Sequence, residues 1–110
     1  MADSPRVQHL SAPELKSMLD EGRPLELVDV RTEQERAIAA IDGARLLDKA
    51  SHDVLLALPK DTTLVFQCHH GVRSQAAAEY FLQMGFTNVF NLDGGIDAWS
   101  LVVDPAVQRY

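Results

Sequence analysis

The sequence predicts a single α/β domain built around a mostly parallel sheet with helices on both faces. Short apolar stretches typical of buried strands alternate along the chain with segments that carry helix caps and helix formers. The chain has 110 residues, of which 46% are hydrophobic, and this supports one small core. We therefore expect one domain over residues 1–110, with its core over about 6–102 and an irregular C-terminal tail.

Capping signals divide the first half of the chain. Ser11 and Glu14 have the spacing of a capping box, and Thr32 and Glu35 repeat it, so a helix is expected after each. Gly22 ends the first of these helices. The expected elements are a strand over residues 6–10, a helix over 12–21, a strand over 25–30, a helix from 32 towards 40, and a short strand over 44–47.

The second half repeats the alternation of strand and helix. Ser51 is the expected N-cap of a short helix that ends before Pro59. Three alanines at 76–78 and a glycine at 85 indicate a long helix and its end. The expected elements are that short helix, a strand over 63–67, a helix over 73–84, a strand over 88–91, a helix over 96–101, and an irregular tail over 104–110.

Charge and cysteine content narrow the classes of function. The formal net charge is −6, which argues against nucleic acid or an anionic membrane as a partner. No apolar run approaches the roughly 20 residues of a membrane span, and the first residues lack the apolar segment of a signal peptide. One cysteine forms no intrachain disulfide, which suits a reducing compartment. We expect a cytoplasmic protein, and the sequence leaves its oligomeric state open.

Cys68 lies where a buried strand is expected to end and a helix to begin. In a parallel sheet, ligands bind beyond the carboxyl ends of the strands, so this segment should lie beside those that follow Val28 and Asn91. A tight loop that leads into a helix points backbone N–H groups inward, and these favour an anion such as a thiolate. Gly71 permits the tight turn. We therefore expect Cys68 to be a nucleophile with a pKa below the usual thiol value of about 8.5.

The neighbours of Cys68 add charge and hydrogen-bond donors. Arg73 supplies a fixed positive charge, and Ser74 is placed to cap the helix or to donate to the sulfur. His69 and His70 add charge when they are protonated. Adjacent histidines beside a cysteine also suggest a metal, but we expect none. Sequential neighbours usually point apart, and no second ligand cluster has metal-site spacing.

Four short motifs occur in order along the chain. Residues 28–31 read Val-Asp-Val-Arg, residues 42–44 read Asp-Gly-Ala, residues 68–74 read Cys-His-His-Gly-Val-Arg-Ser, and residues 94–99 read Gly-Gly-Ile-Asp-Ala-Trp. They are similar to the Asp-Val-Arg strand end, the Pro-Gly-Ala turn, the Cys-x-x-Gly-x-Arg loop and the closing Gly-Gly-x-x-x-Trp of rhodanese domains. The ordered set resembles this family of sulfurtransferases from about residue 10 to residue 99.

The resemblance implies a five-stranded, mostly parallel sheet flanked by helices, and a sulfur transfer in two steps. Cys68 attacks the outer sulfur of a small-molecule donor and carries it as a persulfide that the loop amides hold. A thiol or cyanide then accepts the sulfur, and a protein thiol is a further candidate acceptor. No cofactor is implied. The loop residues expected to bind the substrate are His69, His70, Gly71, Val72, Arg73 and Ser74.

Asp29 and Arg31 are the expected supporting residues. By analogy with residues that orient catalytic groups elsewhere, Asp29 should brace backbone amides or the loop arginine. Arg31 either forms a structural ion pair or attracts the substrate. Members of the family that use thiosulfate carry fixed cations inside the loop, where this chain has His69, His70 and Val72. This departure leaves the physiological donor open.

Other functions stay open at this point. Rhodanese-fold phosphatases and arsenate reductases resemble this loop but place five residues between cysteine and arginine, whereas this chain has the four residues 69–72. A non-catalytic binding module is a second alternative, against which the retained cysteine, glycine and arginine argue. A sulfur relay to a protein acceptor is compatible with them. The chain also resembles bacterial rhodanese domains fused to monothiol glutaredoxins, which implies a thiol- or glutathione-linked partner.

Overall fold

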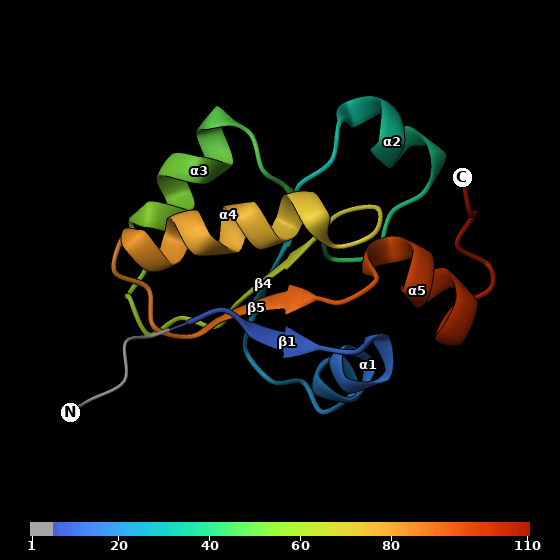
Figure 1. Cartoon of the computed structure of the whole chain (residues 1–110), viewed down its shortest axis with the longest axis horizontal. Coiled ribbons are helices and arrows are strands. Elements are labelled where there is room, and N and C mark those ends of the chain that lie inside the picture. The colour runs from blue at the N-terminus through green and yellow to red at the C-terminus, as the bar shows by residue number, and fades with distance from the viewer. Residues whose placement is uncertain (1–5) are drawn as a thin grey trace.

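The structure of the protein, a computed structural model, describes residues 6–110 and contains a five-stranded parallel sheet (Figure 1). The strand order is β1-β5-β4-β2-β3, and each neighbouring pair is parallel. The predicted α/β class is confirmed, and the sheet is parallel throughout rather than mostly so. The strands are β1 (Gln8–Leu10), β2 (Glu26–Asp29), β3 (Arg45–Leu46), β4 (Leu64–Gln67) and β5 (Val89–Leu92).

Helices cover both faces of this sheet because its central strands are buried on both sides. Along β4, Phe66 packs with Phe81 of α4, whereas Val65 belongs to the opposite cluster with Trp99 of α5. In Figure 1, α3 and α4 accordingly lie on one side of the strands and α1 on the other. Within residues 6–110, no helix is long and apolar enough to cross a bilayer. The helices are α1 (Ala12–Asp20), α2 (Glu33–Ile38), α3 (Lys49–Leu56), α4 (Val72–Gln83) and α5 (Gly95–Val102).

The helix caps follow the sequence signals with one correction. Capping boxes begin α1 at Ser11 and α2 at Thr32, as predicted. The N-cap of α3 is Asp48, so the prediction of Ser51 as the cap is wrong. Ser51 is the third helical residue, and its hydroxyl accepts from the Asp48 amide at 2.9 Å and donates to the Leu46 carbonyl at 2.7 Å. Serine and aspartate are comparable N-cap residues, so residue preference alone did not distinguish Asp48 from Ser51.

The start of α5 packs directly against the segment that leaves β4. The amides of Ile96 and Asp97 donate to the carbonyls of Cys68 and His69 at 2.8 and 3.1 Å. Gly95 makes this approach possible, since a β-carbon at that position would lie 2.2 Å from the Cys68 carbonyl oxygen. Its φ of 60° is also in the left-handed region that favours glycine. The carboxyl end of β4 is thereby fixed between two helices.

We predict that Gly95→Ala destabilises the fold strongly, because the new methyl group meets backbone that has no room to move. The expected loss is about 3 kcal/mol or more of unfolding free energy, measured by urea denaturation. Gly22→Ala is the matched control, since Gly22 has a similar φ of 68° but open space around its β-carbon position. The control should lose only about 1 kcal/mol. Equal losses in both variants would contradict the close contact.

Candidate active site

The sulfur of Cys68 is surrounded by donors from its own loop. Cys68 directly follows β4 and is only 1% exposed. The backbone amides of Gly71 and Ser74 point at Sγ at distances of 3.1 and 3.4 Å. Gly71 is the N-cap of α4, with a φ of 101°, and it supplies no side chain to satisfy the first amides of the helix. These unsatisfied amides are therefore free to hold an anion at the sulfur.

The hydroxyl of Ser74 is shared between this sulfur and Asn91 of β5. Ser74 Oγ lies 3.4 Å from Cys68 Sγ and 2.5 Å from Asn91 Oδ1. Asn91 Nδ2 donates to the Gly71 carbonyl at 3.1 Å, which turns Oδ1 towards the serine. Because a hydroxyl has one proton, Ser74 donates to one of these acceptors at a time. Asn91 was not among the predicted site residues, although an amide side chain near the end of an apolar strand indicates a polar group beside the loops at that edge of the sheet.

Opposing effects act on the Cys68 thiol. Burial raises the pKa of Cys68, whereas hydrogen bonds from the Ser74 hydroxyl and from the amides of Ser74, Gly71 and Arg73 lower it. The hydrogen bonds prevail, so the pKa lies below the ordinary thiol value. A lowered pKa increases the fraction of thiolate, which is the nucleophilic form of cysteine.

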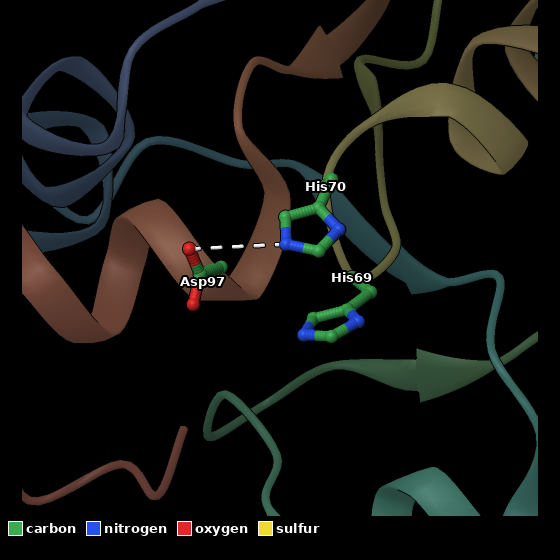
Figure 2. A group of neighbouring side chains, drawn as sticks. All are labelled: His69, His70 and Asp97. Atoms are coloured by element: carbon green, nitrogen blue, oxygen red, sulfur yellow. Dashed lines mark ion pairs between the residues drawn. The ribbon is translucent and has the colours of Figure 1, made fainter. Parts of the chain in front are cut away.

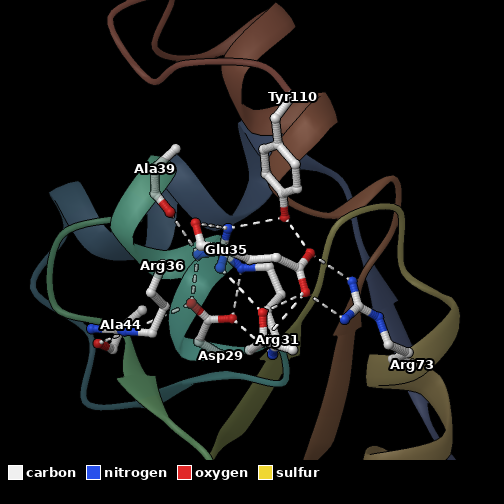
Figure 3. Close-up of polar contacts among 9 residues, drawn as sticks. Asp29, Arg31, Glu35, Arg36, Ala39, Ala44, Arg73 and Tyr110 are labelled. Atoms are coloured by element: carbon white, nitrogen blue, oxygen red, sulfur yellow. Dashed lines mark hydrogen bonds and ion pairs between the residues drawn. The ribbon is translucent and has the colours of Figure 1, made fainter.

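The guanidinium of Arg73 is paired rather than free. It donates to both carboxylate oxygens of Glu35 at 2.7 and 2.9 Å (Figure 3). This pairing holds the pKa of the Glu35 carboxyl far below its usual range. Arg73 brings the expected fixed positive charge to the loop, and the Glu35 carboxylate balances that charge. Glu35 was predicted only as a capping residue, and its contact with Arg73, 38 positions away, left no mark in the local sequence.

Asp29 and Arg31 form a buried ion pair behind the loop. Arg31 Nη2 and Nε donate to the Asp29 carboxylate at 2.7 and 2.8 Å, and neither side chain is exposed. Arg36 adds a third contact to Asp29 at 3.2 Å. Asp29 also accepts from the Arg31 amide, so it braces a backbone amide but not Arg73. The burial and pairing of Arg31 favour the structural alternative over attraction of the substrate.

The C-terminal tail returns to the site and contacts the loop. The segment has no helix or strand, as predicted, but its Tyr110 ring stacks on His69 with 3.9 Å between centroids and 8° between planes. The Tyr110 hydroxyl donates to Glu35 at 2.6 Å and accepts from Arg31 at 3.1 Å. Figure 3 shows this hydroxyl between the two charged groups. Nothing in the polar tail sequence indicated that it would cover the site.

Among the side chains of the inner loop, the two histidines pack against other rings, whereas Val72 is exposed to solvent. His69 and His70 stack on each other with centroids 3.9 Å apart, so the expectation that these neighbours point apart is wrong. Tyr110 also stacks on His69, so the three rings form one stack. His70 Nε2 lies 3.9 Å from Asp97 (Figure 2). Val72 is 78% exposed and contributes little to the immediate surroundings of the sulfur.

This fold, with a free cysteine in an amide-lined loop beyond β4, matches one protein family. The model of the rhodanese-like domain matches residues 11–101, and the chain belongs to this family. It is 42% identical over 92 residues to the thiosulfate sulfurtransferase GlpE of Pseudomonas aeruginosa strain LESB58, with 83% of each chain covered. A rhodanese-like domain protein from Staphylococcus aureus has a similar structure, with a TM-score of 0.73, 31% identity, and coverage of 94% of this chain and 99% of that one.

A longer relative contains only one region that corresponds to this chain. The chain is 38% identical over 112 residues to the probable adenylyltransferase/sulfurtransferase MoeZ of Mycobacterium tuberculosis strain H37Rv. The match covers 99% of this chain but 29% of MoeZ. Both relatives are named as sulfurtransferases, which supports the sulfurtransferase class predicted from the sequence motifs.

We predict that Cys68 reacts with iodoacetamide at a rate that rises with pH, with a midpoint below the pKa of an ordinary thiol. The rate should rise because the thiolate, which forms above the lowered pKa, is the reactive species. Ser74→Ala should move the midpoint upwards, since it removes one donor to the sulfur. Ser51→Ala is the control, because it also removes a buried hydroxyl but does not contact Cys68. A midpoint unchanged by Ser74→Ala would show that the amides alone hold the thiolate.

We also predict that Tyr110→Ala makes Cys68 more accessible. The substitution removes an aromatic stack and two hydrogen bonds with charged groups, which together restrain the tail and the loop. The alkylation rate at fixed pH should therefore rise roughly tenfold or more. Tyr80→Ala is the control, since Tyr80 is a half-exposed tyrosine on α4 that bonds to His52 instead. Equal rates in wild type and Tyr110→Ala would mean that the tail does not restrict the sulfur.

Proposed function

We propose that this protein transfers sulfane sulfur from a donor to a thiophilic acceptor through a persulfide at Cys68. The Cys68 thiolate attacks the outer sulfur of the donor. The new S–S bond forms as the donor's own bond to that sulfur breaks, and the leaving group departs with the electron pair, as sulfite when thiosulfate is the donor. The acceptor then attacks the outer sulfur of the persulfide, and the Cys68 thiolate leaves.

The observation that carries this proposal is the set of donors around Sγ. A persulfide carries its negative charge on the outer sulfur, one bond beyond Sγ, and preorganised amides stabilise such a charge without reorganising. The amides of Gly71 and Ser74 are held by the turn at Gly71 and by the bond from Asn91 to the Gly71 carbonyl. In this proposal Cys68 is the catalytic residue and the loop 69–74 binds the transferred sulfur and the donor. Asp29 and Arg31 position the segment behind it.

The proposed substrates are a small-molecule sulfur donor and a thiol or cyanide acceptor, with a protein thiol as a further acceptor. The relatives named as thiosulfate sulfurtransferases make thiosulfate and cyanide the first pair to assay. The chemistry uses the thiol and backbone of the chain, so the proposal includes no cofactor. We further propose that residues 1–110 act as one domain in the cytoplasm, where a free thiol remains reduced.

Intact-mass measurement tests the proposal. Incubation with thiosulfate should add the mass of one sulfur atom to the protein, and cyanide should remove it with formation of thiocyanate. Cys68→Ser should show no gain, because it lacks the attacking thiolate. Glutathione persulfide and mercaptopyruvate serve as alternative donors in the same assay. If no donor adds sulfur to the wild-type protein, the chain acts as a binding module and the proposal is wrong.

We predict that Glu35→Gln lowers the KM for an anionic donor. The substitution removes the negative charge that balances Arg73, while glutamine preserves the capping box of α2. The KM for thiosulfate should fall roughly two- to fivefold, the range expected for a partly exposed ion pair. Glu33→Gln is the control, since it removes the same charge from the same helix at an exposed position. An equal fall in both variants would mean that only the overall charge matters.

A further inference from the structure

The side chains of His69, His70 and Asp97 form a cluster of potential metal ligands beside the cysteine loop. The histidines follow Cys68, and Asp97 lies in the first turn of α5. One ligand atom from each of the three lies within 4.8 Å of the other two. Figure 2 shows a ring nitrogen of each histidine on the side that faces the Asp97 carboxylate. Two elements thus present three ligands to one point.

This cluster also contains a buried ring nitrogen that has no hydrogen-bond partner among the described residues. His69 Nε2 is buried and is one of the few buried side-chain polar atoms in residues 6–110 that have no hydrogen-bond partner. Buried polar groups normally have a partner, so such a nitrogen indicates a ligand or water that completes the site. The distance of 3.9 Å from His70 Nε2 to Asp97 Oδ2 is too long for a hydrogen bond, so the two groups do not satisfy each other.

Two of the three ligands, His69 and Asp97, are held in place before any ion binds. His69 is stacked between Tyr110 and His70, and the Asp97 amide donates to the His69 carbonyl at 3.1 Å. Arg109 donates to Asp97 Oδ1 at 2.9 Å, whereas its hydrogen bond to Oδ2 is longer and weaker, at 3.5 Å. Oδ2 therefore stays available on the histidine side. A second group that bonds a coordinating carboxylate orients it, and Arg109 has this position.

We propose that His69, His70 and Asp97 bind one divalent transition-metal ion of the zinc class. Two imidazoles and one carboxylate suit zinc, copper or nickel, whereas calcium and magnesium prefer oxygen ligands. Metal–ligand bonds of about 2.0–2.2 Å require the three atoms to draw closer, and the exposed His70 is the side chain that moves. Three protein ligands leave a fourth position open to water or a thiol. The proposal does not depend on sulfur transfer and does not use the Cys68 thiolate.

Zinc titration by calorimetry, in a buffer that does not bind metal, tests the site. The wild-type protein should bind one Zn²⁺ per chain. His70→Gln and Asp97→Asn should each weaken binding by roughly tenfold or more. Loss of a residue that only hydrogen-bonds a metal ligand already has an effect of this size, and loss of the ligand itself should cost at least as much. Cys68→Ser should bind like the wild type. Cobalt should give the visible bands of a four-coordinate ion without a thiolate charge-transfer band.

A matched control separates a built site from a simple histidine–aspartate pair. His9 Nδ1 lies 2.7 Å from Asp93 at the surface, and His9→Gln should leave zinc binding unchanged. Three outcomes overturn the proposal: binding that His70→Gln does not weaken, binding that disappears in Cys68→Ser, and weakening by His9→Gln equal to that by His70→Gln. His70 is exposed and outside the core, so His70→Gln remains informative even if Asp97→Asn does not fold.

Discussion

Two backbone hydrogen bonds from the start of α5 to the carbonyls of Cys68 and His69 determine the surroundings of the sulfur. The carbonyl oxygens carry partial negative charge and would repel a thiolate if they faced it. Because the Ile96 and Asp97 amides hold these oxygens on the α5 side, the loop is left to present amides to Sγ. The contact requires Gly95, whose missing side chain leaves space for the Cys68 carbonyl. The close packing of α5 against the loop after β4 thus determines which backbone groups face the sulfur.

Asn91 holds the other side of the cysteine loop in place. Its amide group joins the Gly71 carbonyl to the Ser74 hydroxyl, so one side chain of β5 fixes both the turn and the first turn of α4. The sulfur is consequently held by a loop that is tied to the sheet as well as to both neighbouring helices. Such preorganisation lets backbone donors stabilise a charge without the cost of ordering them during the reaction.

Local signals predicted much of this fold, and contacts distant in sequence account for what they missed. The capping boxes at Ser11 and Thr32 and the glycine turn before α4 depend on residues within a few positions of one another. The hydrogen bonds that Arg73 donates to Glu35 and that Arg31 donates to Tyr110 span 38 and 79 positions, and no local pattern encodes them. The stack of Tyr110 on His69 likewise joins residues that are far apart in the sequence. The position of the nucleophile was predictable, whereas the groups that cover it were not.

The buried pair of Asp29 and Arg31 is part of a connected network that has an uneven charge balance. Through Arg36, Tyr110 and Glu35 it reaches Arg73, so three arginines share two carboxylates at one edge of the sheet. One positive charge remains in excess, on a protein whose net charge is −6. Hydrogen bonds to the sulfur lower the pKa of Cys68, and the excess positive charge nearby also favours its ionised form. Although the protein as a whole is acidic, this edge of the sheet therefore has a local attraction for anions.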